Sequence, residues 1–214
     1  MQQHFRTLRL VLTFLFLTLV FSSCADEEVT KAGSRFPNVY NADDTWLISW
    51  YVCGSDLESE YGAASADIEE LLETELPPNV RVLILAGGTR EWQNDEFRSN
   101  ELNLYLYDVD GLHRVVAMKN GDMGDERTLE NFLRYGAENF SADHNVFVFW
   151  DHGGGSAAGV CCDERTENML RLNDLRQAFS AVYGEHPAEP PYELVGFDAC
   201  LMASYETAAT LAGY

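Results

Sequence analysis

Short apolar runs alternate with longer amphipathic segments along most of the chain. Runs of apolar residues bounded by turn residues are typical of buried strands, whereas apolar residues spaced three and four positions apart are typical of helices. We predict strands at residues 46–52, 80–86, 101–109, 112–118, 145–150 and 194–197. We predict helices at residues 64–75, 128–139, 171–183 and 201–211.

The order of these elements predicts the fold class. An Asp110-Gly111 turn joins two of the strands into a β-hairpin. Most other strands are separated by helices, which is the arrangement of parallel strands covered on both faces. The chain is therefore predicted to be an α/β protein with a mostly parallel central sheet. In such sheets ligands bind beyond the carboxyl ends of the strands.

The amino-terminal residues follow a different pattern. Arg6 and Arg9 precede an apolar run that ends at Phe21, and Ser22-Ser23-Cys24 follows. The run is too short to span a bilayer as a mature helix, so residues 1–24 are predicted to be an export signal. Small residues before a cysteine resemble the lipobox of bacterial lipoproteins, which predicts a lipidated Cys24 anchored in an envelope membrane. The alternative is an ordinary signal peptide that leaves Cys24 as a free thiol.

Residues 25–44 are polar and begin with three acidic side chains after Ala25, so we predict a solvated tether. An acidic stretch after a lipidated cysteine also resembles the surface-export signals of lipoproteins in the Bacteroides group, which makes surface display an alternative to a purely structural tether. The remaining residues, 45–214, are predicted to form the folded domain.

Composition and charge narrow the classes of function. The chain has 214 residues, of which 46% are hydrophobic and 23% charged, as expected for one globular domain and not for a disordered or coiled-coil protein. Its formal net charge of −21 makes nucleic acid a poor partner. The cysteines Cys53, Cys161, Cys162 and Cys200 show no Cys-x-x-Cys spacing, so neither a zinc site nor a disulfide framework is predicted.

Two polar clusters directly follow predicted strands. The first is Asp151-His152-Gly153-Gly154-Gly155, and the second is Asp198-Ala199-Cys200. At the start of a predicted helix, Cys200 would have its thiolate stabilised by free N–H groups and the helix dipole. His152 can supply a proton, and the N–H groups of Gly153 and Cys200 can bind an oxyanion. The alternative is a buried, inert cysteine beside a structural histidine.

These clusters carry a resemblance to the clostripain family of cysteine endopeptidases, which is part of the caspase, gingipain and legumain clan. The sequence around Phe197-Asp198-Ala199-Cys200-Leu201-Met202-Ala203 resembles the family's Ala-Cys motif, and Asp151-His152-Gly153 resembles its His-Gly motif. Weaker matches occur at Asp56-Leu57-Glu58, Asp67-Ile68-Glu69-Glu70 and Met123-Gly124-Asp125. The matches extend from Trp46 to about Leu211.

The resemblance implies a caspase-like αβα sandwich that cleaves proteins or peptides after Arg or Lys. It implies that His152 is the general acid and Cys200 the nucleophile. It also places Asp198 near the pocket for the basic substrate side chain, where a carboxylate can bind Arg bidentately. The alternative for Asp198 is a strand-end residue that only orients the loop. Asp151 is predicted to be structural.

The resemblance also raises questions of extent and cofactors. Relatives usually continue well beyond the Ala-Cys motif, so we expect the sheet to be incomplete at its carboxyl end and the substrate pocket to lack some parts. Family members can depend on calcium. The sequence contains no calcium-binding loop of the EF-hand type, and Asp108-Val109-Asp110-Gly111 is better explained as a hairpin turn, so no metal ligand is predicted.

Arg165 is a candidate self-cleavage site. Peptidases of this clan are often made as zymogens, and Arg165 lies in the polar segment 159–169, which is predicted to be an exposed loop. An enzyme that cuts after Arg would meet its preferred residue there. The alternative is a solvated arginine that pairs loosely with Glu164 or Glu167.

Two other functions compete with a peptidase. His-Gly-Gly-Gly is similar to the oxyanion motif of lipases, but an α/β-hydrolase esterase needs a Gly-x-Ser-x-Gly elbow, and Gly154-Gly155-Ser156-Ala157-Ala158 lacks the last glycine. The second competitor is a surface-anchored binding lipoprotein that keeps the peptidase fold without turnover.

Overall fold

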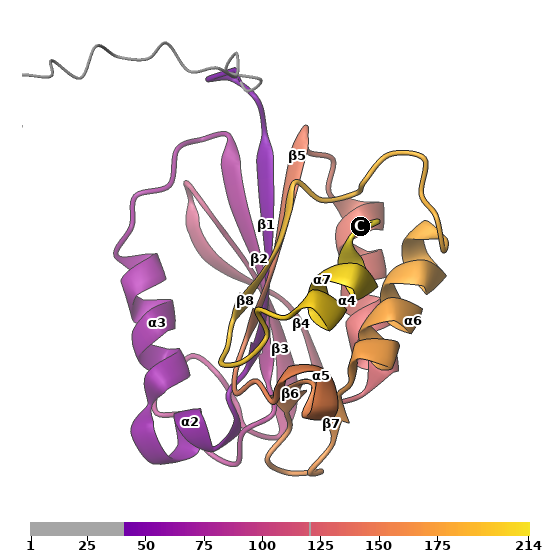
Figure 1. The fold of residues 1–214 in the computed structure, drawn as a ribbon. Helices are drawn as coiled ribbons and strands as arrows, with labels where there is room; N and C mark the ends of the chain where they lie inside the picture. Colours follow the sequence, from indigo (N-terminus) through magenta and orange to yellow (C-terminus); the bar gives the residue numbers. More distant parts are fainter. Residues whose placement is uncertain (1–40, 120) are drawn as a thin grey trace, which may run out of the picture. The chain divides into compact units, whose positions relative to one another are not determined.

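A six-stranded sheet runs through the part of the chain that the computed structural model describes, residues 41–119 and 121–214 (Figure 1). The strands lie in the order β4-β3-β2-β1-β5-β8. β2, β1, β5 and β8 are mutually parallel, whereas β3 is antiparallel to both β2 and β4. The strands are β1 Trp46–Cys53, β2 Val80–Gly87, β3 Glu101–Asp108, β4 Gly111–Lys119, β5 His144–Trp150 and β8 Leu194–Asp198.

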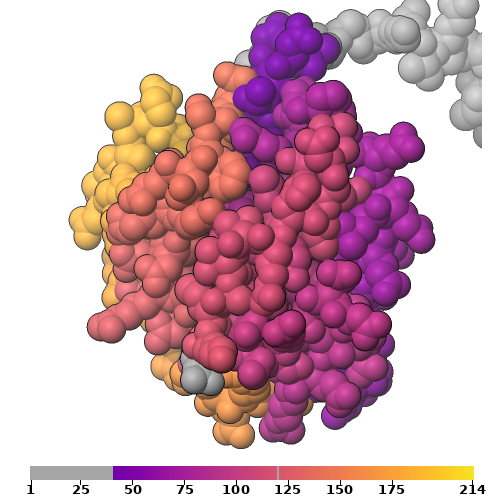
Figure 2. All heavy atoms as spheres, turned by 180° about the vertical axis from the view of Figure 1, so that it is seen from behind, coloured from indigo at the N-terminus to yellow at the C-terminus, as the bar shows by residue number. Residues whose placement is uncertain are grey.

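Helices cover both faces of this sheet. α2 and α3 lie on one side, and α4, α6 and α7 lie on the other (Figure 1). Seen from behind, the β3–β4 hairpin and α4 form much of the visible surface (Figure 2). The helices are α2 Ser55–Tyr61, α3 Ala63–Leu72, α4 Glu126–Asn139, α5 Gly155–Ala158, α6 Leu172–Tyr183 and α7 Tyr205–Leu211. The predicted α/β class with a mostly parallel sheet is confirmed.

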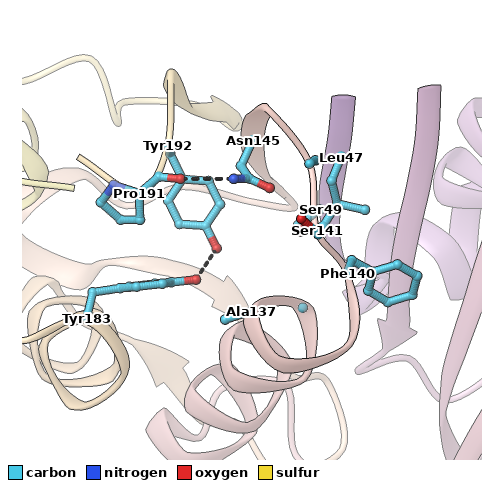
Figure 3. Close-up of a pocket in the computed structure, with 11 residues that line it drawn as sticks. Leu47, Ser49, Ala137, Phe140, Ser141, Asn145, Tyr183, Pro191 and Tyr192 are labelled. Carbon is cyan, nitrogen blue, oxygen red and sulfur yellow. Dashed lines mark hydrogen bonds between the residues drawn. The ribbon is translucent and has the colours of Figure 1, made fainter. Parts of the chain in front are cut away.

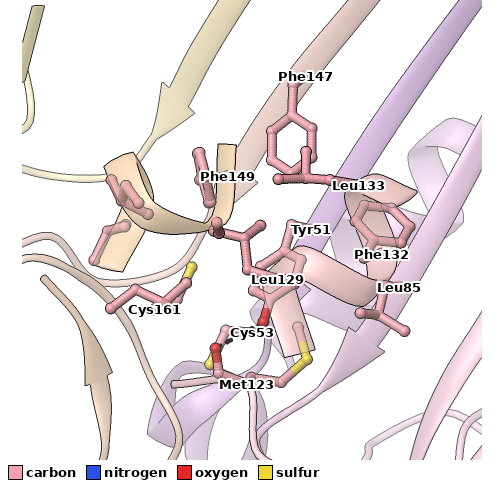
Figure 4. Packing of buried hydrophobic residues seen from close by; sticks show 14 of the residues in the cluster. Tyr51, Cys53, Leu85, Met123, Leu129, Phe132, Leu133, Phe147, Phe149 and Cys161 are labelled. Carbon is pink, nitrogen blue, oxygen red and sulfur yellow. Dashed lines mark hydrogen bonds between the residues drawn. The ribbon is translucent and has the colours of Figure 1, made fainter. Parts of the chain in front are cut away.

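Alternation along the strands produces two apolar layers, because successive side chains of a strand point to opposite faces. On one face, Tyr51 of β1 packs with Phe147 and Phe149 of β5 and with Leu129 of α4 (Figure 4). The Tyr51 hydroxyl is fully buried and donates a hydrogen bond to the Met123 carbonyl (2.8 Å). This cluster fixes α4 and the loop before it against the sheet.

The layer on the other face is formed by the intervening residues of the same strands. Val52 of β1 and Ile84 of β2 belong to a buried cluster with Ala64 and Ile68 of α3. Trp150, the last residue of β5, joins this cluster, and its indole N–H donates to the carboxylate of Asp67 on α3 (2.6 Å). The end of β5, where the His-Gly motif begins, is therefore fixed from the α3 side.

Several predicted boundaries are wrong. The helix predicted at residues 201–211 begins only at Tyr205, and α2 was not predicted. α4 starts at Glu126 because the Asp125 side chain accepts a hydrogen bond from the Arg127 N–H (2.7 Å) and caps the helix. The polar segment 159–169 contains an unpredicted antiparallel hairpin of β6, Val160–Cys162, and β7, Met169–Leu170.

The predictions for the amino terminus lie outside the described residues. These are the signal peptide at residues 1–24, the lipidated Cys24 and the tether as far as residue 40. Residues 42–214 form one compact unit. Among the described helices, none is both long enough and apolar enough to cross a membrane.

Candidate active site

The candidate site lies where the strand order reverses. β1 has β2 on one side and β5 on the other, and the carboxyl ends of β1, β5 and β8 meet at one edge of the sheet. His152 follows β5 by two residues, and Cys200 follows β8 by two residues. Because Trp150 pairs with Asp198 in the parallel ladder, the two motifs leave the sheet at the same level. This is the position at which α/β sheets bind ligands.

Gly153 brings the two motifs into contact. A Cβ atom added to Gly153 would lie 1.9 Å from the Cys200 carbonyl oxygen, so no side chain fits between the two backbones. The side chains of His152 and Cys200 are both exposed. The structure thus brings the predicted His152 and Cys200 to neighbouring positions at the surface, with Gly153 packed directly against the cysteine backbone.

The glycine segment after His152 is folded back onto the β6–β7 hairpin. The Gly154 N–H donates to the Gly159 carbonyl (2.8 Å), and Cys161 N–H donates to the His152 carbonyl (3.4 Å). Between these bonds, the Gly153 N–H donates to no acceptor in the described part of the chain. The Cys200 N–H likewise has no acceptor among the described residues. Both amides that were predicted to bind an oxyanion therefore keep their donors available.

The predicted reason for a stabilised Cys200 thiolate is wrong. Cys200 lies in a turn between β8 and α7. The helix begins five residues later at Tyr205, after the N-cap residue Ser204, whose hydroxyl accepts a hydrogen bond from the Thr207 N–H (3.2 Å). The turn is closed by Leu201, which adopts a left-handed conformation (φ 61°). The dipole of α7 therefore does not start at the cysteine, and any activation of Cys200 has to come from other groups.

The remaining described cysteines differ from Cys200 in their surroundings. Cys53 and Cys161 are fully buried, and burial raises their thiol pKa values well above the ordinary value. Burial also raises the pKa of Cys162, which is half-buried. All four described cysteines are free, and Cys200 is the exposed member of the set.

Asp198 and Asp151 occupy contrasting positions. Asp198 is exposed, and its carboxylate has no hydrogen bond or ion pair within the described residues. Asp151 is 3% exposed and accepts hydrogen bonds from the Ser55 hydroxyl (2.5 Å) and the Cys162 N–H (2.6 Å). Burial raises the pKa of Asp151 from 3.8 to about 6, although these hydrogen bonds act in the opposite direction. Asp151 thus ties three segments together, as its predicted structural role requires.

Asp56 is a site residue that the sequence analysis did not assign. Its carboxylate Oδ1 lies 2.9 Å from Nε2 of His152. Asp56 follows β1, the central strand, by three residues, at the edge where His152 follows β5. The sequence did contain an indication of this contact, because polar residues that follow neighbouring parallel strands converge at one edge of the sheet. Asp56 was not assigned because the helix that contains it, α2, was not predicted.

Arg165 lies in the turn of the β6–β7 hairpin and is only partly exposed. Its guanidinium donates to the carbonyls of Ser99 (2.8 Å) and Gly121 (3.4 Å). Its backbone N–H donates to Asp163, a fully buried carboxylate (2.9 Å). Glu164 instead pairs with Arg90 (3.5 Å), so the alternative of a loose pair between Arg165 and Glu164 is not observed.

Metal-binding side chains do not cluster in the described part of the chain, which contains no group of three or more His, Cys, Asp or Glu side chains arranged to hold an ion. Asp108 and Gly111 pair at the end of the β3–β4 hairpin, as predicted for a turn.

Cavities lie both away from and beside the site. One of about 340 Å³ lies near the amino ends of β1 and β5 and is lined by Leu47, Ser49, Asn145 and the hydrogen-bonded pair Tyr183 and Tyr192 (Figure 3). A groove of about 650 Å³ runs along β8 and α7. The residues that line this groove include Phe197 of β8 and Met202, Ala203 and Ser204, which follow Cys200 in the sequence.

Comparisons with known proteins agree on one family. The model of the clostripain family, peptidase C11, matches residues 50–214. The chain is 25% identical over 183 residues to clostripain from Hathewaya histolytica, in an alignment that covers 74% of this chain and 34% of clostripain. The chain thus spans about a third of that relative's length.

Three solved structures resemble the fold. A secreted C11 cysteine protease from Bacteroides thetaiotaomicron, in complex with an irreversible peptide inhibitor, has a TM-score of 0.59 at 20% identity and is matched over 79% of this chain and 46% of its own. A secreted C11 cysteine protease from the same species, called iotapain, has a TM-score of 0.61 at 14% identity and is matched over 81% of this chain and 51% of its own. An inactive zymogen C11 protease from Parabacteroides distasonis has a TM-score of 0.51 at 23% identity and is matched over 83% of this chain and 47% of its own. At these identities the likeness establishes the fold.

Proposed function

The chain belongs to the clostripain family of cysteine peptidases, and from this premise we propose that it is a cysteine endopeptidase that cuts proteins or peptides after Arg or Lys. The observation that supports this most directly is the contact of Gly153 with the Cys200 backbone, which joins the two motifs at the carboxyl edge of the sheet. No other described cysteine is both exposed and beside a histidine at a strand end.

The proposed reaction uses His152 and Cys200 in two stages. The Cys200 thiol gives its proton to His152 as its sulfur bonds to the scissile carbonyl carbon. His152 then protonates the leaving amine nitrogen as the C–N bond breaks, which leaves a thioester. Water next gives a proton to His152 and its oxygen to the carbonyl carbon; the C–S bond breaks, and the thiol regains the proton. The N–H groups of Gly153 and Cys200 would bind the oxyanion in both stages.

The proposed preference for Arg or Lys depends on Asp198. Its exposed carboxylate has no partner in the described residues and lies two positions before the nucleophile. A guanidinium of the substrate can bind such a carboxylate through two parallel hydrogen bonds. We expect Asp198→Asn to lower kcat/KM for Arg reporters by about tenfold or more, and to affect a neutral reporter less. An unchanged Arg preference would leave Asp198 with a purely structural role.

The test of the proposed activity compares single-residue variants of the full chain on an Arg- or Lys-ending reporter peptide. Cys200→Ala should abolish turnover and His152→Ala should remove most of it, whereas Cys162→Ser, which alters a thiol outside the site, should retain it. A thiol-directed peptide inhibitor ending in Arg should label wild type at Cys200 and leave Cys200→Ala unlabelled. Turnover by Cys200→Ala would overturn the assignment.

A surface-anchored binding lipoprotein that keeps the peptidase fold without turnover is the second candidate. The same experiment separates the two. A scaffold would bind peptides without cleaving them and would not be labelled at Cys200, whereas an enzyme would show both labelling and turnover.

We also propose that the protein is exported and lipid-anchored through Cys24. The similar structures from Bacteroides thetaiotaomicron are of secreted proteases, and the lipobox-like sequence before Cys24 adds the anchor. In the native host, an alkyne-labelled fatty acid should be incorporated into wild type and not into Cys24→Ala. Absence of label from wild type would favour an ordinary cleaved signal.

Self-processing after Arg165 remains a proposal, and the structure adds a condition to it. The Arg165 side chain is held by two backbone carbonyls and its amide by Asp163, so the hairpin turn would have to open before the bond after Arg165 could enter an active site. Mass spectrometry of purified protein should find a new amino terminus at Thr166 that is missing in Cys200→Ala. An intact and fully active chain would rule this out.

A further inference from the structure

Asp56 and His152 form a side-chain pair at the surface of the site. Asp56 Oδ1 and His152 Nε2 are 2.9 Å apart, and both side chains are about half exposed, at 50% and 46%. The other imidazole nitrogen, Nδ1, bonds to no group in the described part of the chain. An exposed pair of this kind contributes little to stability. Its position, beside the proposed proton donor, suggests a different use.

The backbone that carries Asp56 is strained at the preceding residue. Ser55 has φ 49°, in the left-handed region that residues with a Cβ avoid, and its side chain is buried. Such conformations are unfavourable and persist where surrounding contacts impose them. The contact here is the hydrogen bond from the Ser55 hydroxyl to Asp151 (2.5 Å).

Two consecutive residues after β1 therefore bind two consecutive residues after β5. Ser55 holds Asp151 in the interior, and Asp56 meets His152 at the surface. The hydrogen bond between Ser55 and Asp151 fixes the direction of both chain segments. Asp56 and His152 therefore face each other at the surface.

Helix α2, which begins at Ser55, is held in place by a separate set of buried hydrogen bonds. Glu58, two residues beyond Asp56, is fully buried and accepts hydrogen bonds from the Ser65 hydroxyl (2.5 Å), the Ser65 N–H (2.8 Å) and the Gln93 N–H (2.6 Å). These bonds fix α2 to α3 and to the loop after β2. The Asp56 backbone is thus held on both sides, by Ser55 and by Glu58.

We infer that Asp56 is a positioning residue for His152. Its carboxylate holds Nε2, which leaves Nδ1 as the nitrogen that exchanges protons with Cys200 and with the leaving amine. This inference rests on the proposed peptidase function, since it gives the imidazole one orientation for both proton transfers.

A kinetic comparison of three full-length variants with wild type tests the role. Asp56→Ala should lower kcat by about tenfold or more with little change in KM, because it frees the imidazole without altering substrate contacts. Asp56→Asn should restore much of the rate, since its side-chain oxygen can still accept the imidazole N–H. Glu60→Ala, which removes an exposed carboxylate one turn further along α2, is the matched control and should behave as wild type.

A double substitution separates positioning from structural support. If Asp56 acts through the imidazole, adding Asp56→Ala to His152→Ala should cause no further loss of rate. A further loss of about tenfold would show that Asp56 acts independently of His152. A rise in KM or a lost Arg preference in Asp56→Ala would identify a substrate-binding carboxylate instead. Each of these results would overturn the inference.

A measurement that needs no turnover keeps this test separate from that of the proposed function. In long-range ¹H–¹⁵N spectra of the full chain, the His152 ring nitrogens should shift in Asp56→Ala and stay unchanged in Glu60→Ala. Unchanged His152 signals in Asp56→Ala would overturn the inference even if the enzyme is active. A chain that hydrolyses nothing but shows these shifts would reject the peptidase function and retain the contact.

Discussion

A buried carboxylate directly precedes the exposed histidine of the site. Asp151 is enclosed by the ends of β1 and β5 and the β6–β7 hairpin, and it accepts bonds from Ser55 and Cys162. Burial dominates over these bonds and raises its pKa to about 6. Its ionised form is therefore the costly one in the folded protein, and its protonation favours folding.

This shift predicts a pH dependence of stability. The stabilisation from protonated Asp151 is fully present below its unfolded pKa of 3.8 and is lost as the pH rises through about 6. It amounts to at most about 3 kcal/mol. The free energy of unfolding of wild type relative to Asp151→Asn, measured in urea, should therefore fall between pH 4 and 6 and level off above. A difference that stays constant over this range would contradict the assignment.

Gly153 supports a prediction about close packing. In Gly153→Ala the new methyl group would lie 1.9 Å from the Cys200 carbonyl oxygen, so the ends of β5 and β8 would have to separate. We expect a loss of about 1–3 kcal/mol in the free energy of unfolding and a loss of Cys200 labelling by the Arg inhibitor. Gly196→Ala is the control, because its methyl group would make only ordinary contacts at 3.7 Å. Equal behaviour of the two variants would refute the argument.

Among the secondary-structure elements, the sequence pattern correctly located the strands and helices whose apolar residues recur with a strong periodicity. The four parallel strands and α4 and α6 contain the apolar residues of the core, and they lie within a few residues of their predicted positions. α2 was not predicted because its seven residues are mostly polar and their position depends on the buried Glu58, one of whose partners, Gln93, is distant in sequence. β6 and β7 have three and two residues, too few for any periodicity to register.

The candidate site was predictable to a similar extent. His152, Gly153 and Cys200 follow predicted strands, so their convergence followed from the topology. The contact of Asp56 with His152 depends on the left-handed turn at Ser55, which no local pattern indicates. The error at Cys200 arose because apolar spacing does not reveal where a helix is capped.

The start of α7 can be tested directly. Ser204 caps the helix through its bond with the Thr207 N–H, so Ser204→Ala should cost about 1 kcal/mol of stability. Cys200→Ala should leave stability nearly unchanged, because the thiol caps no helix. Thermal unfolding of both variants would measure the difference. A stability loss confined to Cys200→Ala would instead support a helix that starts at the cysteine.

At the scale of the whole molecule, charge should govern encounters with substrate. The formal net charge of −21 attracts cationic peptides over a distance that salt shortens. We expect kcat/KM for an Arg reporter to fall severalfold as ionic strength rises from about 0.02 to 0.2 M, mainly through slower association. Alkylation of Cys200 by an uncharged reagent should not change. If alkylation fell in parallel, salt would be acting on the site and not on the encounter.

The meeting of three strand ends also determines when the site can exist during synthesis. Asp56 leaves β1, His152 leaves β5 and Cys200 leaves β8, so the three residues emerge from the ribosome at widely separated times. Cys200 meets His152 only after β8 has paired with β5, and the loop closures required are long. A growing chain that has folded only its earlier strands has no assembled site. Under the proposed peptidase function, a chain in which β8 has not yet paired with β5 would therefore be unable to cut itself or its neighbours.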